Sequence, residues 1–203
     1  MPPLKLGVLL SGGGTTLENL VSEITARRLD AEITVVISSS PKAFGLTRAR
    51  NHGIAAHTLR LEDLDGIGSY SRAITEILVA AGVELVVLAG FLKLYEVPEI
   101  YTGRVMNIHP ALIPKFCGAG YYGHHVHEAV IAAGETESGC TVHYCDNEYD
   151  HGPIILQRRV PVLPDDTPDT LAARVFVEEC NAYPEAIRRF MAERERFIAE
   201  REK

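Results

Sequence analysis

The chain contains 203 residues, of which 46% are hydrophobic and 23% are charged, and its formal net charge at pH 7 is −7. These proportions are close to those of ordinary globular domains and argue against disorder. The acidic balance argues against a nucleic-acid partner, because a general nucleic-acid binder needs excess lysine and arginine to displace counterions from phosphates. A single folded domain spanning residues 1–203 is the simplest interpretation.

Membrane attachment and metal binding are not indicated by the sequence. The longest apolar runs, such as residues 82–91, reach only strand length, and this one contains Glu84. Residues 1–5 lack the apolar stretch of a signal peptide. The four cysteines show no CxxC spacing, so packing residues in a reducing cytoplasm are a better interpretation than metal ligands. We therefore expect a cytoplasmic protein with no membrane partner and no metal.

Strand-like and helix-like periodicities alternate through the first half of the chain. Predicted strands cover residues 4–10, 33–37, 54–59, 84–88 and 104–108, and predicted helices cover residues 16–28, 43–52 and 70–81. This alternation is typical of an α/β fold, in which a mostly parallel sheet carries helices on both faces. In the second half, strand-like runs at 139–145 and 153–162 flank a charged loop, and a long helix follows from about Thr167, with a break expected near Pro184.

A glycine-rich turn, Ser11-Gly12-Gly13-Gly14-Thr15-Thr16, follows the first predicted strand. Glycines permit a tight turn and let an anion approach the backbone amides. The helix that follows adds unpaired N–H groups and a partial positive charge. The segment is neither GxGxxG nor a P-loop, which requires a lysine. Phosphate binding is the functional interpretation, and a plain strand–helix turn is the alternative.

Asn107 and His109 stand at the carboxyl end of a predicted strand, where open parallel sheets bind ligands. Strand alternation places both side chains on one side, while Ile108 points to the other and packs. An asparagine amide can donate to a developing oxyanion, and a histidine can hold or release a proton near neutrality. The pair is therefore interpreted as part of a reaction centre.

The loop from 146 to 152 carries the carboxylates Asp146, Glu148 and Asp150. Taken alone, Asp146 and Glu148 fit a solvated hairpin loop. Asp150 stands where the chain must turn back into a strand, and a carboxylate there could orient His109 and raise its pKa.

Three histidines, His124, His125 and His127, lie within four positions. His124 and His127 could share a helical face, which suggests a metal, but only Glu128 stands nearby as a further ligand. We interpret the segment instead as a loop that enters a helix, with a mobile stretch at 117–123 before it.

These segments, taken in order, resemble those of the glycinamide ribonucleotide formyltransferases, folate-dependent enzymes of purine biosynthesis. The resemblance runs from Leu4 to about Phe190. Its motifs are Ser-Gly-x-Gly at 11–14, Ala-Phe-Gly-Leu at 43–46, Leu-Ala-Gly-Phe at 88–91, Asn-Ile-His-Pro-Ala-Leu-Ile-Pro at 107–114, Gly-Cys-Thr-Val-His at 139–143, Asp-His-Gly-Pro-Ile-Ile-Leu-Gln at 150–157 and Tyr-Pro at 183–184. It implies a formyltransferase fold, which has a Rossmann-like sheet, a C-terminal antiparallel strand and a long helix. The half 1–100 would bind phosphate, and the half 101–203 would bind folate and carry catalysis.

The resemblance also implies an activity and the residues that perform it. The formyl group of 10-formyltetrahydrofolate would pass to the amino group of 5′-phosphoribosylglycinamide, both of them small molecules, in a monomer or homodimer. Asn107, His109 and Asp150 would be catalytic, with Asp150 holding His109 charged. The implied phosphate and ribose ligands are Gly13, Gly14, Thr15, Thr16 and Glu179. The implied folate-binding residues are Leu92, Lys93, Leu94, Cys145, Asp146, Asn147 and Glu148.

The sequence departs from the family's common pattern at a few positions. Thr15-Thr16 stands where Ser-Asn is common, Lys93 where arginine is frequent, and Cys180 where histidine is frequent. Alternatives to the implied function are a formyltetrahydrofolate hydrolase and a formyltransferase that acts on another small amine. Formylation of methionyl-tRNA is disfavoured because it would require a further basic domain. A catalytically silent nucleotide-binding module is disfavoured because all three catalytic candidates are present.

Overall fold

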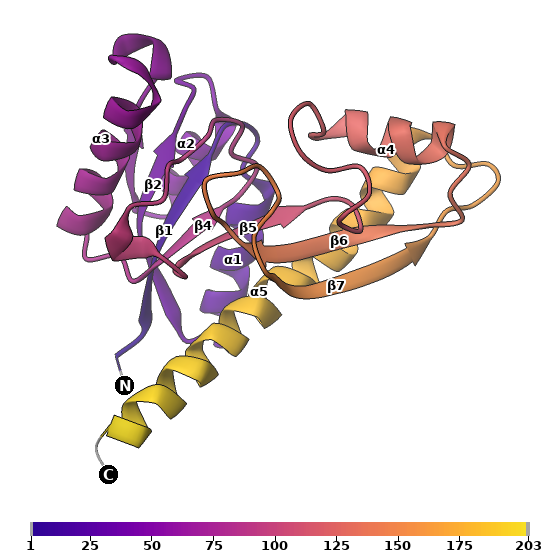
Figure 1. Ribbon diagram of the computed structural model, residues 1–203. Coiled ribbons are helices and arrows are strands. Elements are labelled where there is room, and N and C mark those ends of the chain that lie inside the picture. The colour runs from indigo at the N-terminus through magenta and orange to yellow at the C-terminus, as the bar shows by residue number, and fades with distance from the viewer. Residues whose placement is uncertain (1, 202–203) are drawn as a thin grey trace.

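The computed structural model describes residues 2–201, and within them the chain forms one seven-stranded sheet, five α-helices and two short 3-10 helices (Figure 1). The strands are β1 (Leu4–Leu10), β2 (Ala31–Ser38), β3 (Ala55–Thr58), β4 (Leu85–Leu88), β5 (Val105–His109), β6 (Glu137–Tyr144) and β7 (Ile154–Pro161). The helices are α1 (Thr15–Thr25), α2 (Phe44–Asn51), α3 (Gly66–Ala80), α4 (His124–Ala132) and α5 (Pro168–Arg201), with η1 (Leu61–Asp63) and η2 (Glu99–Tyr101).

The strand order across the sheet is β3-β2-β1-β4-β5-β6-β7. The first five strands of the chain pair in parallel. Strand β6 runs opposite to the other six strands, because it pairs antiparallel with both β5 and β7. The predicted α/β class, the mostly parallel sheet, the C-terminal antiparallel strand and the long last helix are all confirmed.

Alternation along β1 sends its side chains to two different cores. Leu6, Val8 and Leu10 join the core against α1, α2 and α5, whereas Leu9 joins the core against α3. Gly7 allows α3 to pack closely, since an added Cβ would overlap the side chain of Leu78. Helices therefore cover both faces of the sheet (Figure 1).

Helix α5 continues through Pro184, so the predicted break there is wrong. A proline lacks an N–H group and deprives the carbonyl four residues earlier, here that of Cys180, of its intrahelical partner. Asn19 of α1 donates its Nδ2 to this carbonyl at 2.9 Å. The preceding residue, Tyr183, is fully buried, with its hydroxyl 2.9 Å from the Leu88 carbonyl oxygen and 2.8 Å from that of Met106. These contacts fix α5 to α1, β4 and β5.

The start of α5 agrees with the prediction of a cap near Thr167. The Thr167 hydroxyl accepts a hydrogen bond from the Thr170 N–H at 3.3 Å, and Pro168 occupies the first helical position. Within residues 2–201, no helix combines the length and the apolar character that crossing a bilayer requires.

Candidate active site

Two cavities adjoin at the carboxyl ends of the central strands. The first, the Asp150 cavity, has a volume of about 270 Å³ and is lined by residues following β4, by the end of β5 and by the loop after β6. The second, the glycine-loop cavity, has a volume of about 340 Å³ and lies between the turn after β1 and helices α4 and α5. Both cavities are lined by Gly90, Ile108, Pro110 and Gly123, so they share a wall.

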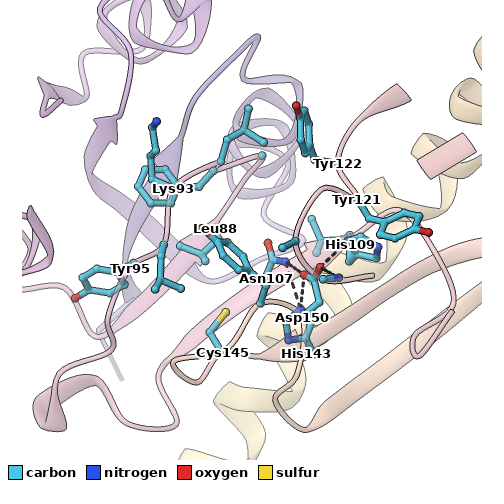
Figure 2. A pocket seen from close by; sticks show the side chains of 18 of the residues that line it. Leu88, Lys93, Tyr95, Asn107, His109, Tyr121, Tyr122, His143, Cys145 and Asp150 are labelled. Atoms are coloured by element: carbon cyan, nitrogen blue, oxygen red, sulfur yellow. Dashed lines mark hydrogen bonds and ion pairs between the residues drawn. The ribbon is translucent and has the colours of Figure 1, made fainter. Parts of the chain in front are cut away.

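Asn107, His109 and Asp150 meet on the wall of the Asp150 cavity (Figure 2). Asn107 and His109 project from β5 on the same side, as strand alternation predicts. Asp150 Oδ1 lies 3.2 Å from Asn107 Nδ2, and Asp150 Oδ2 lies 3.4 Å from His109 Nδ1. The carboxylate therefore touches both partners, although it lies far from them in the sequence.

The loop before β7 aims Asp150 at β5. Asp150 has a φ of 54°, a left-handed conformation that aspartate tolerates better than most residues. Gly152 lets the chain pass close to β6, because an added Cβ would overlap the carbonyl oxygen of Tyr144. The backbone N–H of Gly118 donates to Asp150 Oδ2 at 2.9 Å. The backbone conformation of Asp150 and the donor N–H of Gly118 together set the position of the carboxylate.

His143 is a fourth member of this cluster, and sequence reasoning missed it. The antiparallel register pairs Asn107 with His143, and the His143 side chain is 2% exposed. His143 Nδ1 lies 2.8 Å from the Tyr144 carbonyl oxygen, which can only accept, so Nδ1 carries a proton. His143 Nε2 faces Asn107 Nδ2 at 3.3 Å and Asp150 Oδ1 at 3.6 Å. A neutral His143 therefore accepts from Asn107, and a protonated one donates to Asp150.

His109 is buried, with acceptors at both ring nitrogens. His109 Nε2 lies 2.7 Å from the carbonyl oxygen of Phe116, and Nδ1 faces Asp150. Burial lowers the pKa of His109 below its ordinary value of 6.5, although Asp150 and the Phe116 carbonyl both raise it. The net direction is opposite to the one expected from Asp150 alone, because removing the imidazolium from water outweighs the attraction of the carboxylate.

The pKa of Asp150 lies below its ordinary value of 3.8. Burial opposes its ionisation, but the contact with His143, the charge of His109 and the N–H of Gly118 together lower the pKa of Asp150 below 3.8. Asp150 is therefore a carboxylate near neutral pH.

The glycine-loop cavity contains every residue expected to bind phosphate or ribose, namely Gly13, Gly14, Thr15, Thr16 and Glu179. Gly14 is the N-cap of α1, with a φ of 74°, and no side chain in the described structure caps this helix. Its first N–H groups are therefore free to bind an anion. An added Cβ on Gly14 would lie 2.6 Å from the Cα of Gly45, so glycine is required where α1 and α2 approach. Across the cavity, burial raises the pKa of Glu179 to about 7.

Six of the seven residues expected to bind folate line the Asp150 cavity. These are Leu92, Lys93, Leu94, Cys145, Asp146 and Glu148. Asn147 does not line it, and its Oδ1 accepts a hydrogen bond from the Val97 N–H at 2.8 Å. Aromatic residues that the sequence did not single out, Phe91, Tyr95 and Tyr149, complete the walls.

Ser11, which directly precedes the glycines of the turn after β1, contacts a residue of the Asp150 cavity. Its Oγ accepts a hydrogen bond from the Leu92 N–H at 2.9 Å and lies 2.6 Å from Ser39 Oγ. Both halves of the chain line both cavities, since Leu92 from the first half faces the Asp150 cavity and Glu179 from the second faces the glycine loop.

The three clustered histidines take different positions. His124 pairs with Asp169 at 2.8 Å, His125 pairs with Glu128 at 3.3 Å, and His127 is buried against the glycine-loop cavity. Among residues 2–201, no group of three or more histidine, cysteine, aspartate or glutamate side chains is arranged to hold a metal ion.

Comparison with known proteins identifies relatives of this arrangement. A family model described as formyl transferase matches residues 4–187. The phosphoribosylglycinamide formyltransferase of Escherichia coli (strain K12) is 37% identical over 183 residues, which make up 89% of this chain and 84% of that protein. The trifunctional purine biosynthetic protein adenosine-3 of Drosophila pseudoobscura pseudoobscura is 41% identical over 92% of this chain, which spans only 14% of that longer protein.

A solved structure is also similar to this chain in both fold and sequence. Glycinamide ribonucleotide transformylase 1 from Symbiobacterium toebii has a TM-score of 0.87 and 38% sequence identity, and the match covers 95% of this chain and 89% of that one. The fold, the ordered motifs and the matched family model agree, and the resemblance seen in the sequence is confirmed: the chain is an enzyme that belongs to the formyl transferase family.

Proposed function

We propose that this enzyme transfers the formyl group of 10-formyltetrahydrofolate to the amino group of 5′-phosphoribosylglycinamide, a step of purine biosynthesis in the cytoplasm. The observation that carries the proposal is the shared wall of the two cavities beside Asn107 and His109. One cavity offers free helix N–H groups suited to a phosphate, and the other offers apolar and aromatic walls suited to a pterin ring. The similarity to the Escherichia coli and Symbiobacterium toebii enzymes supports the same assignment.

In the proposed reaction, the substrate amine attacks the formyl carbon, and a C–N bond forms. The carbonyl oxygen becomes an oxyanion, which the Asn107 amide and the His109 ring stabilise. The tetrahedral intermediate then breaks its bond to N10 of the folate. The amine loses one proton and N10 gains one, and Asp150, as a carboxylate held by His143 and Gly118, is placed to accept and return it.

The polar groups of this site make hydrogen bonds and ion pairs with one another. The Asn107 amide faces Asp150 and His143 at 3.2 and 3.3 Å, and His109 faces Asp150 at 3.4 Å, all of which are long contacts. The contact between His109 Nε2 and the Phe116 carbonyl is shorter, at 2.7 Å. The formyl oxygen must therefore replace one of these partners when it binds, and the long contacts are the easier ones to exchange.

The proposal is tested by incubating the purified chain with 10-formyltetrahydrofolate and glycinamide ribonucleotide while following both deformylated folate and formylated amine. We expect the two products in equal amounts and little deformylation without the amine. Deformylation that proceeds equally well without the amine would identify a hydrolase. Formylation of a different amine in preference to glycinamide ribonucleotide would identify another small-amine transferase.

A further inference from the structure

His127 is a buried polar side chain that the proposed mechanism does not use. It lies on α4, is 4% exposed and lines the glycine-loop cavity. Its Nδ1 is buried and has no hydrogen-bond partner among the residues that the structure describes. The other ring nitrogen, Nε2, is therefore the atom through which this side chain can contact a ligand in the cavity.

The cavity that His127 faces lies between two helix N-termini. Gly14 begins α1 and Gly123 begins α4, and neither helix has a side-chain cap in the described part of the chain. Gly123 and His124 line the same cavity as the glycine loop. Both helix ends carry partial positive charge and unpaired N–H groups, so an anion between them would be held from two sides.

The cationic side chains normally used to bind phosphate are absent from this wall. Among the described residues that line the cavity, none is lysine or arginine. His124 lies at the rim, where it pairs with Asp169 at 2.8 Å. His127 is therefore the buried side-chain nitrogen that can donate to an anion in this cavity, and Glu179 of α5 is a carboxylate that lines the same cavity.

The charge state of His127 follows from its surroundings. Burial, together with the neighbouring His124 of α4 and His109 of β5, lowers the pKa of His127 to about 4, so its ring is neutral near pH 7. A neutral imidazole carries one proton. Because Nδ1 has no acceptor, the tautomer protonated at Nε2 avoids burying an unpaired N–H and leaves Nε2–H as a free donor.

We propose that His127 is a substrate-binding residue, whose Nε2–H donates a hydrogen bond to the phosphate of a ribose 5-phosphate ligand held between the N-termini of α1 and α4. The inference rests on the proposed function and adds α4 to the phosphate site that the glycine loop forms. Helix α4 packs against α5, which also contributes Glu179, so the ligand would be enclosed by three helices.

Steady-state kinetics of three variants test this role. His127→Leu removes both ring nitrogens and should raise the KM for glycinamide ribonucleotide about 10-fold or more, with the KM for 10-formyltetrahydrofolate unchanged. His127→Gln keeps an N–H donor near the Nε2 position and should recover part of the loss. His125→Leu is the matched control, because His125 is exposed on the same helix and pairs with Glu128, and it should behave as wild type.

Nuclear magnetic resonance of the wild-type protein, labelled with ¹⁵N at histidine, tests the same contact without a substitution. The His127 signal should report a neutral Nε2–H tautomer and should shift when ribose 5-phosphate is added, but not when ribose is added. If the His127 signal does not shift with ribose 5-phosphate, or if ribose shifts it equally, the inference is overturned even when formyl transfer is observed. A phosphate-specific shift in a protein that transfers no formyl group would retain this site and reject the proposed function.

Discussion

A single carboxylate, Asp150, joins the two polar residues of β5 into one cluster. It contacts Asn107 and His109 and accepts a hydrogen bond from the Gly118 N–H. It also remains ionised despite its burial. The two histidines beside it differ in their partners, because His143 donates Nδ1–H to a backbone carbonyl while His109 faces Asp150 with Nδ1. The ionisation of His109 is therefore set by a balance between burial and the Asp150 charge.

Replacing Asp150 with asparagine should disturb this balance in a known direction. Asp150 raises the pKa of His109, and burial lowers it. Asp150→Asn removes the charge and leaves the burial, so the pKa of His109 should fall further, and kcat should fall with it. A histidine titration followed by nuclear magnetic resonance in wild type and variant measures the shift. An unchanged His109 titration would mean that Asp150 does not control the protonation of His109.

The burial of the neutral His127 ring makes the free energy of unfolding depend on pH. Its folded-state pKa of about 4 lies below the ordinary 6.5. The unfolded chain therefore binds a proton below pH 6.5 that the folded protein does not bind until about pH 4, and stability falls as pH decreases through this window. By pH 5 this loss relative to pH 7 is on the order of 2 kcal/mol. Urea unfolding at both pH values should show a smaller loss for His127→Gln, and equal losses would contradict the buried neutral ring.

At the scale of elements, the loop between β6 and β7 and the long helix α5 position the site. Gly152 lets the loop pass against β6 so that Asp150 reaches β5. Helix α5 supplies Glu179 to the glycine-loop cavity and is fixed by Tyr183 and by Asn19 at the proline. Substitutions at Gly152 and Asn19 probe how each element is held.

Gly152→Ala should destabilise the protein and lower kcat. The new Cβ would overlap the Tyr144 carbonyl oxygen, so the loop must shift, with an expected loss of about 1–3 kcal/mol and a displaced Asp150. Gly68→Ala in α3 is the matched control, because its Cβ meets only the Glu96 side chain, at 3.5 Å. Helix propensity should make that variant more stable by about 0.5–1 kcal/mol. Equal urea midpoints for the two variants would show that the close approach at Gly152 does not matter.

The hydrogen bond from Asn19 to the Cys180 carbonyl should depend on the proline. In wild type, Asn19→Ala leaves this carbonyl unpaired and should reduce stability by about 1–2 kcal/mol. Pro184→Ala restores an N–H that can bond the same carbonyl within the helix, so the effect of Asn19→Ala should shrink in that background. A double-mutant cycle in urea measures the coupling. Additive effects would mean that Asn19 does not compensate for Pro184.

At the scale of the whole molecule, the sequence predicted the architecture well because its periodicities were strong. The short apolar run at residues 4–10 marked a buried strand, and Asn107 with His109 marked a polar strand end. These signals are local, and the structure retains them.

The features that escaped prediction depend on contacts between distant segments. His143 was missed because its position opposite Asn107 follows from the register of β5 and β6, which no local pattern specifies. The helix through Pro184 was mispredicted because its compensation comes from Asn19, on a different helix. The lowered pKa of His109 was missed because burial is a property of the assembled site.

If Asn107, His109 and Asp150 form the formyl-transfer centre, the kcat of Asn107→Ala with both substrates saturating reports on it directly. Removing an oxyanion donor should lower kcat by about 10²-fold or more. The variant should keep the far-ultraviolet circular dichroism of wild type, because the Asn107 side chain projects from the end of β5 into the Asp150 cavity. A correctly folded variant with a near-wild-type kcat would contradict the account.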